Sequence, residues 1–366
     1  MRTALTRMLG IEHPIIQAPM AGGPTTPALA AAVSNAGGLG TLGAAYLAPD
    51  TLRREIAAVR ALTDRPFGVN LFVPETPGVT VTAEQITRAQ ALLNPLRAEL
   101  GLPSSPDLPP HTDSFADQLA VVIAERVPVL SFTFGIPARE HLDALRAAGI
   151  LTVGTATTVA EGVALARAGV DAVVGQGSEA GGHRGTFVPD AAYAERALVG
   201  TLALIPQLVD AVDVPVIAAG GISDGRGLLA ALALGAAGAQ MGTAFLACPE
   251  SGAHPQHKAA VLAAADTDTV ITRAFSGRSA RGIVNHFIEA LRVYEAEVAP
   301  FPAQNALTRD IRQAAARVDR GEYLSLWAGQ AARLATARPA SEVVRATVEQ
   351  AERLLRQLGE MEEQGV

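Results

Sequence analysis

The sequence predicts an α/β protein whose main domain is a closed, parallel (β/α)8 barrel, also called a TIM barrel. Two observations lead to this prediction. Short runs rich in Val, Ile and Leu alternate with Ala-rich stretches whose apolar residues recur at helical spacing. Eight such runs fall within roughly 245 residues, close to the length of one (β/α)8 barrel. A doubly wound open sheet is the alternative architecture that the same alternation allows.

Each expected strand is a short, nearly continuous apolar run, as is typical of parallel strands buried on both faces. In chain order, the strands are expected at Ile15–Met20, Leu39–Ala45, Phe67–Val73, Val129–Phe134, Leu151–Ala156, Ala172–Gln176, Val216–Ala219 and Ala239–Leu246. The helix-like stretches between them cover residues 24–35, 51–62, 138–148, 159–168 and 227–234. The first helix begins near Pro24, which suits a first helical turn, and ends at Gly37-Gly38.

Two segments depart from the alternation. Residues 74–111 are too long for a strand-to-helix connection and hold a polar helix-like run at 83–100 and a Pro-rich stretch, so we expect an excursion over the barrel rim. After Leu246 the pattern is helical only, with candidates at 257–265, 282–299, 307–318 and 341–359. We therefore expect a barrel over 1–246, a smaller helical substrate-binding domain over 247–335, and a C-terminal helix in 336–366 that returns to the barrel.

Composition excludes several classes of protein. Of the 366 residues, 49% are hydrophobic and 18% are charged, which is too apolar for a disordered chain. Mean hydropathy is +0.25, but the apolar runs are far shorter than the ~18 residues of a membrane span. The net charge of -7 comes without a Lys/Arg cluster that would bind nucleic acid. Cys248 is the single cysteine and no signal peptide is evident, so we expect a cytoplasmic protein without disulfides.

One glycine cluster is misleading. The run Gly38-x-Gly40-x-x-Gly43 matches the dinucleotide-binding fingerprint in its letters. That fingerprint requires a strand before the glycines and a helix after them, whereas here a helix comes first and the glycines lie in the next strand. These glycines more simply let a planar ligand or another stretch of backbone come close.

Two consecutive strands near the end of the barrel lead into turns suited to an anion. The seventh strand ends at Gly220-Gly221, and the eighth contains Gln240-Met241-Gly242-Thr243. Glycine lets backbone N–H groups face an anion without a Cβ in the way. Barrels commonly bind phosphate with the loops after strands 7 and 8. We therefore expect a phosphate site here, although Gly-Gly turns also occur for purely structural reasons.

The sixth strand is followed by the segment richest in chemical groups, Gly175 to Gly185. Glycines surround Gln176, Glu179, His183 and Arg184 at a strand C-terminal end, where barrel enzymes place their chemistry. His183 is the candidate for proton transfer near neutral pH. Glu179 and His183 provide only two possible metal ligands, so we expect no metal.

The first and third strands offer surfaces for a planar ligand. The first ends Ala18-Pro19-Met20, an apolar floor, and the third places the amide of Asn70 among apolar residues. A buried amide is hydrogen-bonded either to neighbouring protein groups or to a ligand with paired donors and acceptors, such as an isoalloxazine edge.

A later segment, Thr272 to Gly282, carries Arg273, Arg278 and Arg281 and no acidic residue. Spacing alone leaves open whether these arginines meet an anion or the barrel rim.

Together these motifs resemble the nitronate monooxygenase family, formerly 2-nitropropane dioxygenase, and within it the bacterial class I enzymes. The resemblance covers nearly the whole chain. It rests on 17–20, 37–40, 68–72, 178–185, 219–222, 240–243, 272–282 and the segment Ser325-Leu326-Trp327-Ala328-Gly329-Gln330. One departure is Phe301-Pro302, where members of the family carry a Tyr-Pro pair.

The resemblance implies an FMN-dependent barrel with a helical domain over its mouth. It implies that His183 is the active-site histidine beside the flavin. It further implies an FMN phosphate on Gly220, Gly221, Gly242 and Thr243 with Gln240 and Met241 in the same strand, and flavin or ribityl contacts from Ala18, Pro19, Met20, Asn70, Gln176 and Gly181.

The implied reaction is oxidation of an alkyl nitronate, such as propionate 3-nitronate, by FMN and O2 to a carbonyl compound and nitrite. The implied partners are therefore small molecules, and the protein is expected as a monomer or a homodimer. FMN-dependent NAD(P)H:quinone reductases and enoyl-ACP reductases share the barrel and its phosphate loops and are the alternative. A non-redox lyase or isomerase that binds a phosphorylated substrate at the same glycines is a further hypothesis.

Overall fold

The computed structural model describes residues 1–363 except 75–77, 79, 105–106, 110–113, 188–192 and 194–195. Eight parallel strands form one sheet in the order β1-β9-β8-β6-β5-β4-β3-β2. Their bounds are β1 (Ile15–Gln17), β2 (Gly40–Gly43), β3 (Phe67–Phe72), β4 (Val129–Thr133), β5 (Leu151–Ala156), β6 (Ala172–Gln176), β8 (Val216–Ala219) and β9 (Gly238–Met241).

The sheet closes where its first and last members meet. Ile16 bridges Leu39 just before β2, and the Gln17 amide donates to Leu39 O at 2.9 Å. The buried Gln17 side chain adds to this seam because its Oε1 accepts from the Thr41 amide at 3.0 Å. The predicted (β/α)8 barrel is therefore confirmed, and the doubly wound open sheet is wrong.

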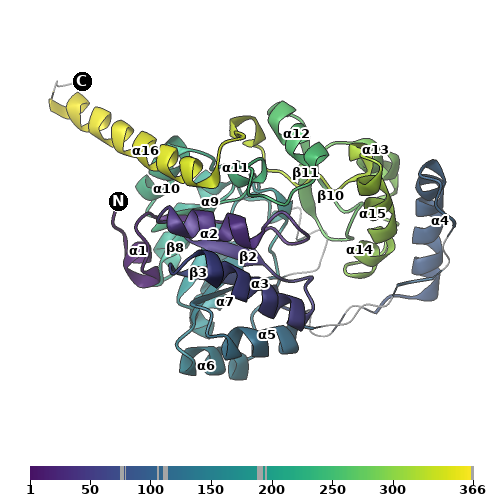
Figure 1. Cartoon of the computed structure of the whole chain (residues 1–366), viewed down its shortest axis with the longest axis horizontal. Helices are drawn as coiled ribbons and strands as arrows, with labels where there is room; N and C mark the ends of the chain where they lie inside the picture. The colour runs from purple at the N-terminus through teal and green to yellow at the C-terminus, as the bar shows by residue number, and fades with distance from the viewer. Residues whose placement is uncertain are drawn as a thin grey trace.

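Helices surround the barrel and bury its outer face (Figure 1). They are α1 (Ala4–Leu9), α2 (Pro27–Asn35), α3 (Pro49–Leu62), α5 (Phe115–Ala124), α6 (Arg139–Ala147), α7 (Val159–Ala168), α9 (Thr201–Ala211), α10 (Gly225–Ala233) and α11 (Thr243–Leu246). The last helix, α16 (Ala340–Glu363), packs on α10 and α2. Gly225 permits that approach, since a Cβ there would lie 2.4 Å from the Ala351 amide nitrogen.

The glycines of the misleading fingerprint are packing residues. A Cβ on Gly40 would lie 1.9 Å from Ala30 O in α2, and one on Gly43 would lie 2.5 Å from the Ala21 amide nitrogen. Both strand positions therefore need glycine because neighbouring backbone occupies the space.

The remaining elements form a smaller lobe beside the barrel, here called the small lobe: residues 247–335 together with α4 (Ala83–Glu99) (Figure 1). Its other helices are α12 (Pro255–Ala263), α13 (His286–Leu291), α14 (Ala303–Leu307) and α15 (Arg309–Arg317), with short 3-10 turns at 292–294, 321–323 and 332–334. Its core includes the stacked rings of Phe275 and Phe287, whose centroids lie 4.2 Å apart. Leu93 and Leu96 of α4 belong to the same apolar cluster.

The small lobe is not wholly helical, which corrects the expectation after Leu246. Strands β10 (Thr269–Thr272) and β11 (Ala280–Ile283) pair antiparallel, and β11 also pairs with β7 (Gly182–His183) from the loop after β6. The expected helix at 282–299 therefore starts later. Its N-cap is Asn285, whose Oδ1 accepts from the Ile288 amide at 3.1 Å.

Several strands end earlier than predicted, and the differences are largest at β9 and β1. β9 ends at Met241 and residues 243–246 form α11, because Gly242 breaks the strand. β1 ends at Gln17, since Pro19 has no N–H to continue the ladder.

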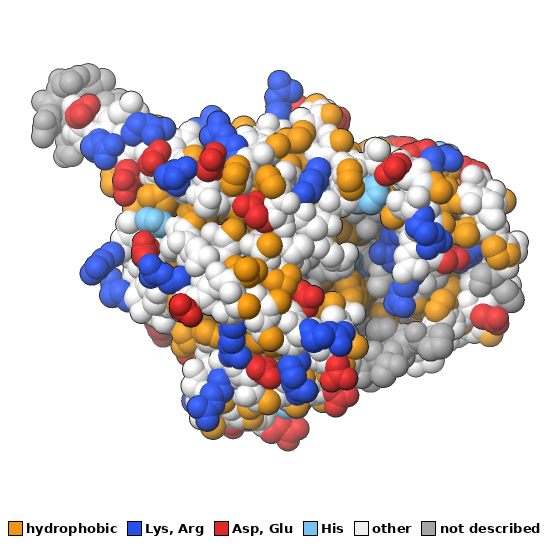
Figure 2. Space-filling model, in the orientation of Figure 1, with side chains coloured by type: hydrophobic (Ala, Val, Ile, Leu, Met, Phe, Trp, Pro, Cys, Tyr) orange, Lys and Arg blue, Asp and Glu red, His pale blue; other side chains and the backbone are white. Residues whose placement is uncertain are grey.

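The excursion between β3 and β4 contains α4, which lies on the outside of the small lobe, far from the C-terminal end of α16 (Figure 1). Of its residues, 75–77, 79, 105–106 and 110–111 lie outside the described residues. The surface is hollowed between the barrel and the small lobe (Figure 2). Among the described residues, no helix combines the length and the hydropathy needed to cross a membrane.

Candidate active site

The turns after β8 and β9 present backbone amides at the carboxyl edge of the barrel. Within the described residues, no backbone carbonyl accepts from the amides of Gly220, Gly221 or Gly242. Gly220 and Gly221 have φ of 114° and 71°, a region that side chains disfavour. Unpaired amides on neighbouring glycine turns are a donor set suited to a phosphate. The two predicted phosphate-binding turns therefore lie on adjacent strands, and both offer donors.

Gly220 and Gly221 also line a recess of about 380 Å³ with Glu179 and Thr201. The carboxylate of Glu179 is bound to protein groups. Its carboxylate accepts from the amide and the hydroxyl of Thr201 at 2.9 Å, which caps α9. The carbonyl of Glu179 accepts from the Gln330 amide at 3.0 Å. Glu179 thus fixes the loop after β6 against the chain around Gln330.

The residues predicted to contact FMN differ in exposure. Ala18, Pro19, Met20, Gln240, Gly242 and Thr243 are partly exposed at the carboxyl edge. Met241, in contrast, is 1% exposed and packs in the core, so only its backbone is near this edge, where its carbonyl accepts from the Ala18 amide at 2.8 Å. Gly181 is needed for packing, since a Cβ there would lie 2.5 Å from the Gly329 amide nitrogen.

The two predicted amide side chains have protein partners. Asn70 is buried in β3 and donates from Nδ2 to Ser131 Oγ at 2.9 Å on β4. Gln176 donates from Nε2 to His183 O at 3.0 Å, and its Oε1 accepts from the Gly185 amide at 2.8 Å. Gln176 therefore shapes the loop that carries His183.

His183 is placed by backbone pairing as well. It lies opposite Ala280 in the antiparallel pairing of β7 and β11. Arg184, the next residue, is buried and donates from Nη1 to Gly177 O at 2.6 Å. The loop thus has its base on barrel strand β6 and its tip on the small lobe.

Aromatic rings enclose the His183 side chain. Its ring centroid lies 5.6 Å from that of Trp327, 5.9 Å from Phe134, 6.1 Å from Phe301 and 6.5 Å from Phe72. Phe72 ends β3 and Phe134 directly follows β4 of the barrel, whereas Phe301 and Trp327 belong to the small lobe. These four rings are here called the aromatic wall, and the His183 side chain beside them is half-buried.

Hydrogen bonding fixes the imidazole tautomer. His183 Nε2 lies 2.8 Å from Ser276 Oγ, and that hydroxyl donates to Arg278 O at 3.1 Å. Because the Ser276 hydroxyl gives its proton to Arg278 O, it accepts from His183. Nε2 of His183 is therefore the protonated donor, and the lone pair is on Nδ1. Burial, followed by the charges of Arg278 and Arg312, lowers the pKa of His183 to about 3. The site therefore contains a neutral imidazole at physiological pH.

The three arginines of 272–282 have different surroundings. Arg273 donates from Nε to Gly277 O at 3.1 Å within its own turn, and Arg281 donates from Nε to Ser178 O at 3.0 Å on the barrel side. Arg278 instead lies over the Phe134 ring, 3.9 Å from its centroid. Arg278 therefore brings positive charge to the aromatic wall beside His183, Arg281 links the small lobe to the barrel, and Arg273 stabilises its own turn.

Comparison with known proteins identifies this arrangement. The family model described as nitronate monooxygenase matches residues 2–350. The chain belongs to the nitronate monooxygenase family. Two relatives carry the name "probable nitronate monooxygenase". The one from Staphylococcus haemolyticus (strain JCSC1435) is 49% identical over 351 residues, covering 96% of this chain and 97% of the relative. The one from Staphylococcus aureus (strain Newman) is 48% identical over 354 residues, covering 97% and 98%.

Solved structures agree in fold. The nitroalkane oxidase from Streptomyces ansochromogenes aligns with a TM-score of 0.90 at 42% identity, covering 97% of this chain and all (100%) of that one. FabK from Thermotoga maritima aligns with a TM-score of 0.78 at 32% identity, covering 99% of both chains. The protein is thus an oxidoreductase of the nitronate monooxygenase family, and membership implies a flavin and small-molecule substrates.

Several residues of this nitronate monooxygenase site were not singled out from the sequence. Ser276 and Phe134 are the main ones. Phe134, directly after β4, has φ of 76°, a left-handed conformation rare for an aromatic residue. No sequence pattern gives that angle, but an aromatic residue directly before Gly135 at a strand exit is a signal that could have drawn attention to it.

Proposed function

We propose that this enzyme oxidises small alkyl nitronates, represented by propionate 3-nitronate, with FMN and O2 to a carbonyl compound and nitrite. The observation that carries the proposal is His183. It is a neutral imidazole inside the aromatic wall, next to Arg278, at the edge of the barrel that also bears the phosphate-binding turns.

The residues present suit FMN in their donor chemistry. The unpaired amides of Gly220, Gly221 and Gly242 suit its phosphate, and the apolar turn at Pro19 and Met20 suits its ring. In this proposal the phosphate contacts are Gly220, Gly221, Gln240, Gly242, Thr243 and the backbone of Met241, and the ring and ribityl contacts are Ala18, Pro19, Met20, Asn70, Gln176 and Gly181. Electron acceptance from the nitronate is the chemistry that FMN supplies when bound.

The chain itself binds and orients the substrate. The positive charge of Arg278 attracts a nitronate, and the apolar rings of the aromatic wall lower the local dielectric constant, so this attraction is less screened than in bulk water. With a nitronate no proton has to move. With a neutral nitroalkane, Nδ1 of His183 is the base that removes the α-proton, and Ser276 holds the ring from the opposite nitrogen.

Anaerobic mixing of purified protein tests the proposal. The expected results are a flavin absorption spectrum and rapid bleaching of that spectrum by propionate 3-nitronate. The likeness to FabK keeps an NAD(P)H-dependent reductase as the competing function. Bleaching by NADH but not by the nitronate would favour that reductase, and protein without flavin absorbance would contradict both.

A further inference from the structure

We propose that Arg97, on helix α4 outside the barrel, is a positioning residue for the nitronate site. Arg97 touches neither His183 nor the aromatic wall. It binds the junction of α14 and α15, and this junction supports the loop that presents Ser276 and Arg278. The inference rests on the proposed function for its kinetic test, and a spectroscopic test stands beside it.

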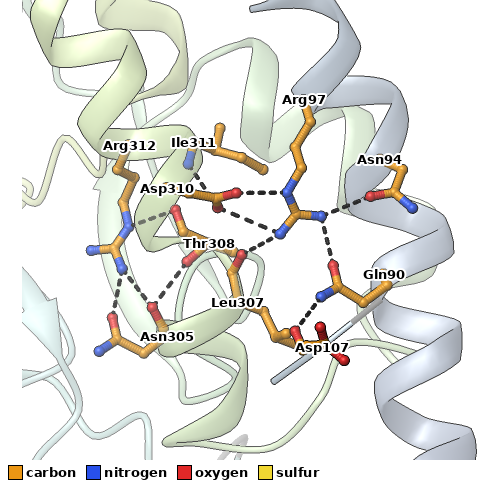
Figure 3. Close-up of polar contacts among 10 residues, drawn as sticks. All are labelled: Gln90, Asn94, Arg97, Asp107, Asn305, Leu307, Thr308, Asp310, Ile311 and Arg312. Carbon is orange, nitrogen blue, oxygen red and sulfur yellow. Dashed lines mark hydrogen bonds and ion pairs between the residues drawn. The ribbon is translucent and has the colours of Figure 1, made fainter. Parts of the chain in front are cut away.

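Arg97 occupies a site built around its guanidinium (Figure 3). Arg97 is only 1% exposed to solvent. Nε donates to Asp310 Oδ2 at 2.8 Å, and Nη2 donates to Leu307 O at 2.7 Å and to Asp310 Oδ1 at 3.4 Å. Nη1 donates to Gln90 Oε1 at 2.6 Å and Asn94 Oδ1 at 2.9 Å. All five N–H donors are thus used, which is the arrangement a buried arginine requires.

Two of these partners flank Thr308. Leu307 ends α14 and Asp310 lies in the first turn of α15. The buried Thr308 hydroxyl donates to Phe275 O at 2.6 Å, and Gln304 Nε2 donates to Ala274 O at 2.8 Å. The junction held by Arg97 therefore fixes the backbone directly before Ser276.

The Arg97 side chain also neutralises one of the charged side chains of α15, the carboxylate of Asp310. Asp310 forms its ion pair with Arg97. Arg312, two residues later, donates from Nη2 to Asn305 O at 2.7 Å and Asn305 Oδ1 at 2.9 Å (Figure 3). Its positive charge acts on His183 and contributes to the lowered pKa of that imidazole. Without Arg97, the carboxylate of Asp310 would be left beside Arg312 and would offset the charge that faces the site.

A purely structural role is the competing explanation, because α4 is attached to the small lobe elsewhere too. Glu99 accepts from the Tyr323 hydroxyl and lies 2.9 Å from His286 Nε2. This contact fixes the same helix without reaching α14 or α15. Glu99→Gln is therefore the control variant that weakens the attachment of α4 without touching α14 or α15. Arg88→Met is the control variant that removes an arginine from the same helix. Arg88 is exposed and pairs with Glu84 at 3.3 Å.

The test compares Arg97→Met and Arg97→Lys with these controls in steady-state kinetics on propionate 3-nitronate. We expect Arg97→Met to raise KM on the order of 10-fold or more, with a smaller change in kcat. Arg97→Lys should restore part of this loss because it keeps the charge beside Asp310. Both control variants should keep the KM of the unmodified enzyme.

A second readout does not depend on turnover. Trp327 is the only tryptophan and its ring centroid lies 5.6 Å from His183, so its emission reports on the site. We expect the emission to shift in Arg97→Met and not in Arg88→Met or Glu99→Gln. If the unmodified enzyme does not oxidise nitronates, the proposed function fails, while the Trp327 emission still tests the positioning role.

Thr308→Val keeps the proposal testable if Arg97→Met does not fold. This variant removes the hydroxyl bond to Phe275 O while nearly preserving shape, and it should shift KM and Trp327 emission in the same direction. Folded Arg97 or Thr308 variants with unchanged KM and unchanged emission would overturn the proposal and leave Arg97 a residue of stability only.

Discussion

His183 Nε2 lies 2.8 Å from Ser276 Oγ. The histidine follows barrel strand β6, whereas the serine belongs to the turn between β10 and β11 of the small lobe. The bond therefore joins the two parts of the molecule at the site itself. It also orients the imidazole so that Nδ1 carries the lone pair, which is the arrangement required of a base.

Replacing Ser276 by Ala should slow turnover of a neutral nitroalkane about 10-fold, because the imidazole loses the acceptor that fixes its ring and tautomer. Oxidation of a preformed nitronate needs no base and should change less. Steady-state kinetics with both substrates measures the difference. Ser279→Ala, in the same turn, is the control, and equal losses with both substrates would contradict a role in proton transfer.

Replacing His183 by Asn should keep FMN bound and reduce turnover of a neutral nitroalkane at least ~10²-fold, the usual scale for a positioned base. Flavin absorbance of the purified variant checks the cofactor, and initial rates check the chemistry. Unchanged turnover would remove His183 from the mechanism.

The pH dependence of nitroalkane turnover should show no titration near 6.5. Burial and the charges of Arg278 and Arg312 lower the pKa of His183 to about 3, so the base is already deprotonated throughout the mildly acidic and neutral range. Log kcat/KM plotted against pH should thus be level through this range. A slope of about one that ends near pH 6.5 would mean that His183 has the pKa of an exposed histidine.

The phosphate-binding turns can be tested with two glycines that both have positive φ. Gly220 has φ of 114° and Gly101 has φ of 70°, so alanine should cost each about 1–2 kcal/mol of stability. Only at Gly220 would the new Cβ meet a neighbour, Thr201 Oγ1 at 2.8 Å. Gly220→Ala should weaken FMN binding about 10-fold or more, as expected for disturbing a charge-assisted hydrogen bond.

Gly101→Ala has open space around its Cβ and should bind FMN like the unmodified protein. Flavin release on ultrafiltration measures both variants. Equal retention by the two would place the phosphate elsewhere.

The barrel could be predicted from sequence because its strands are signalled locally. Runs such as Phe67–Phe72 and Leu151–Ala156 are short, largely apolar and buried at all but one end residue. The limits of the strands were less certain. The end of β9 depends on Gly242, and a strand such as β11 exists only because distant residues pair with it. A two-residue strand like β7 leaves no periodicity to detect.

Part of the site could also be predicted, because some of its residues directly follow strands that are signalled locally. His183 and the glycine turns follow barrel strands, so their neighbourhood could be inferred from strand order. Ser276 and Phe301 come from the small lobe, and only its packing brings them to His183. The surroundings of Arg97 could not be predicted either, since Asp310 is 213 positions away in the sequence.

Two histidines with lowered pKa values predict how stability depends on pH. Burial lowers the pKa of His183 to about 3 and that of His257 to about 4, against 6.5 for an exposed histidine. Between these limits the unfolded chain binds more protons than the folded one, so the free energy of unfolding falls as the pH falls. Each histidine contributes up to about 1.4 kcal/mol per pH unit in that window.

His257→Gln removes one contribution, while Gln can still donate toward Trp327 O, which His257 Nε2 contacts at 3.0 Å. Urea unfolding at about pH 5 and about pH 7.5 should therefore show a smaller loss of stability in the variant than in the unmodified protein. Equal losses would mean that His257 becomes protonated in the folded state as readily as in the unfolded chain.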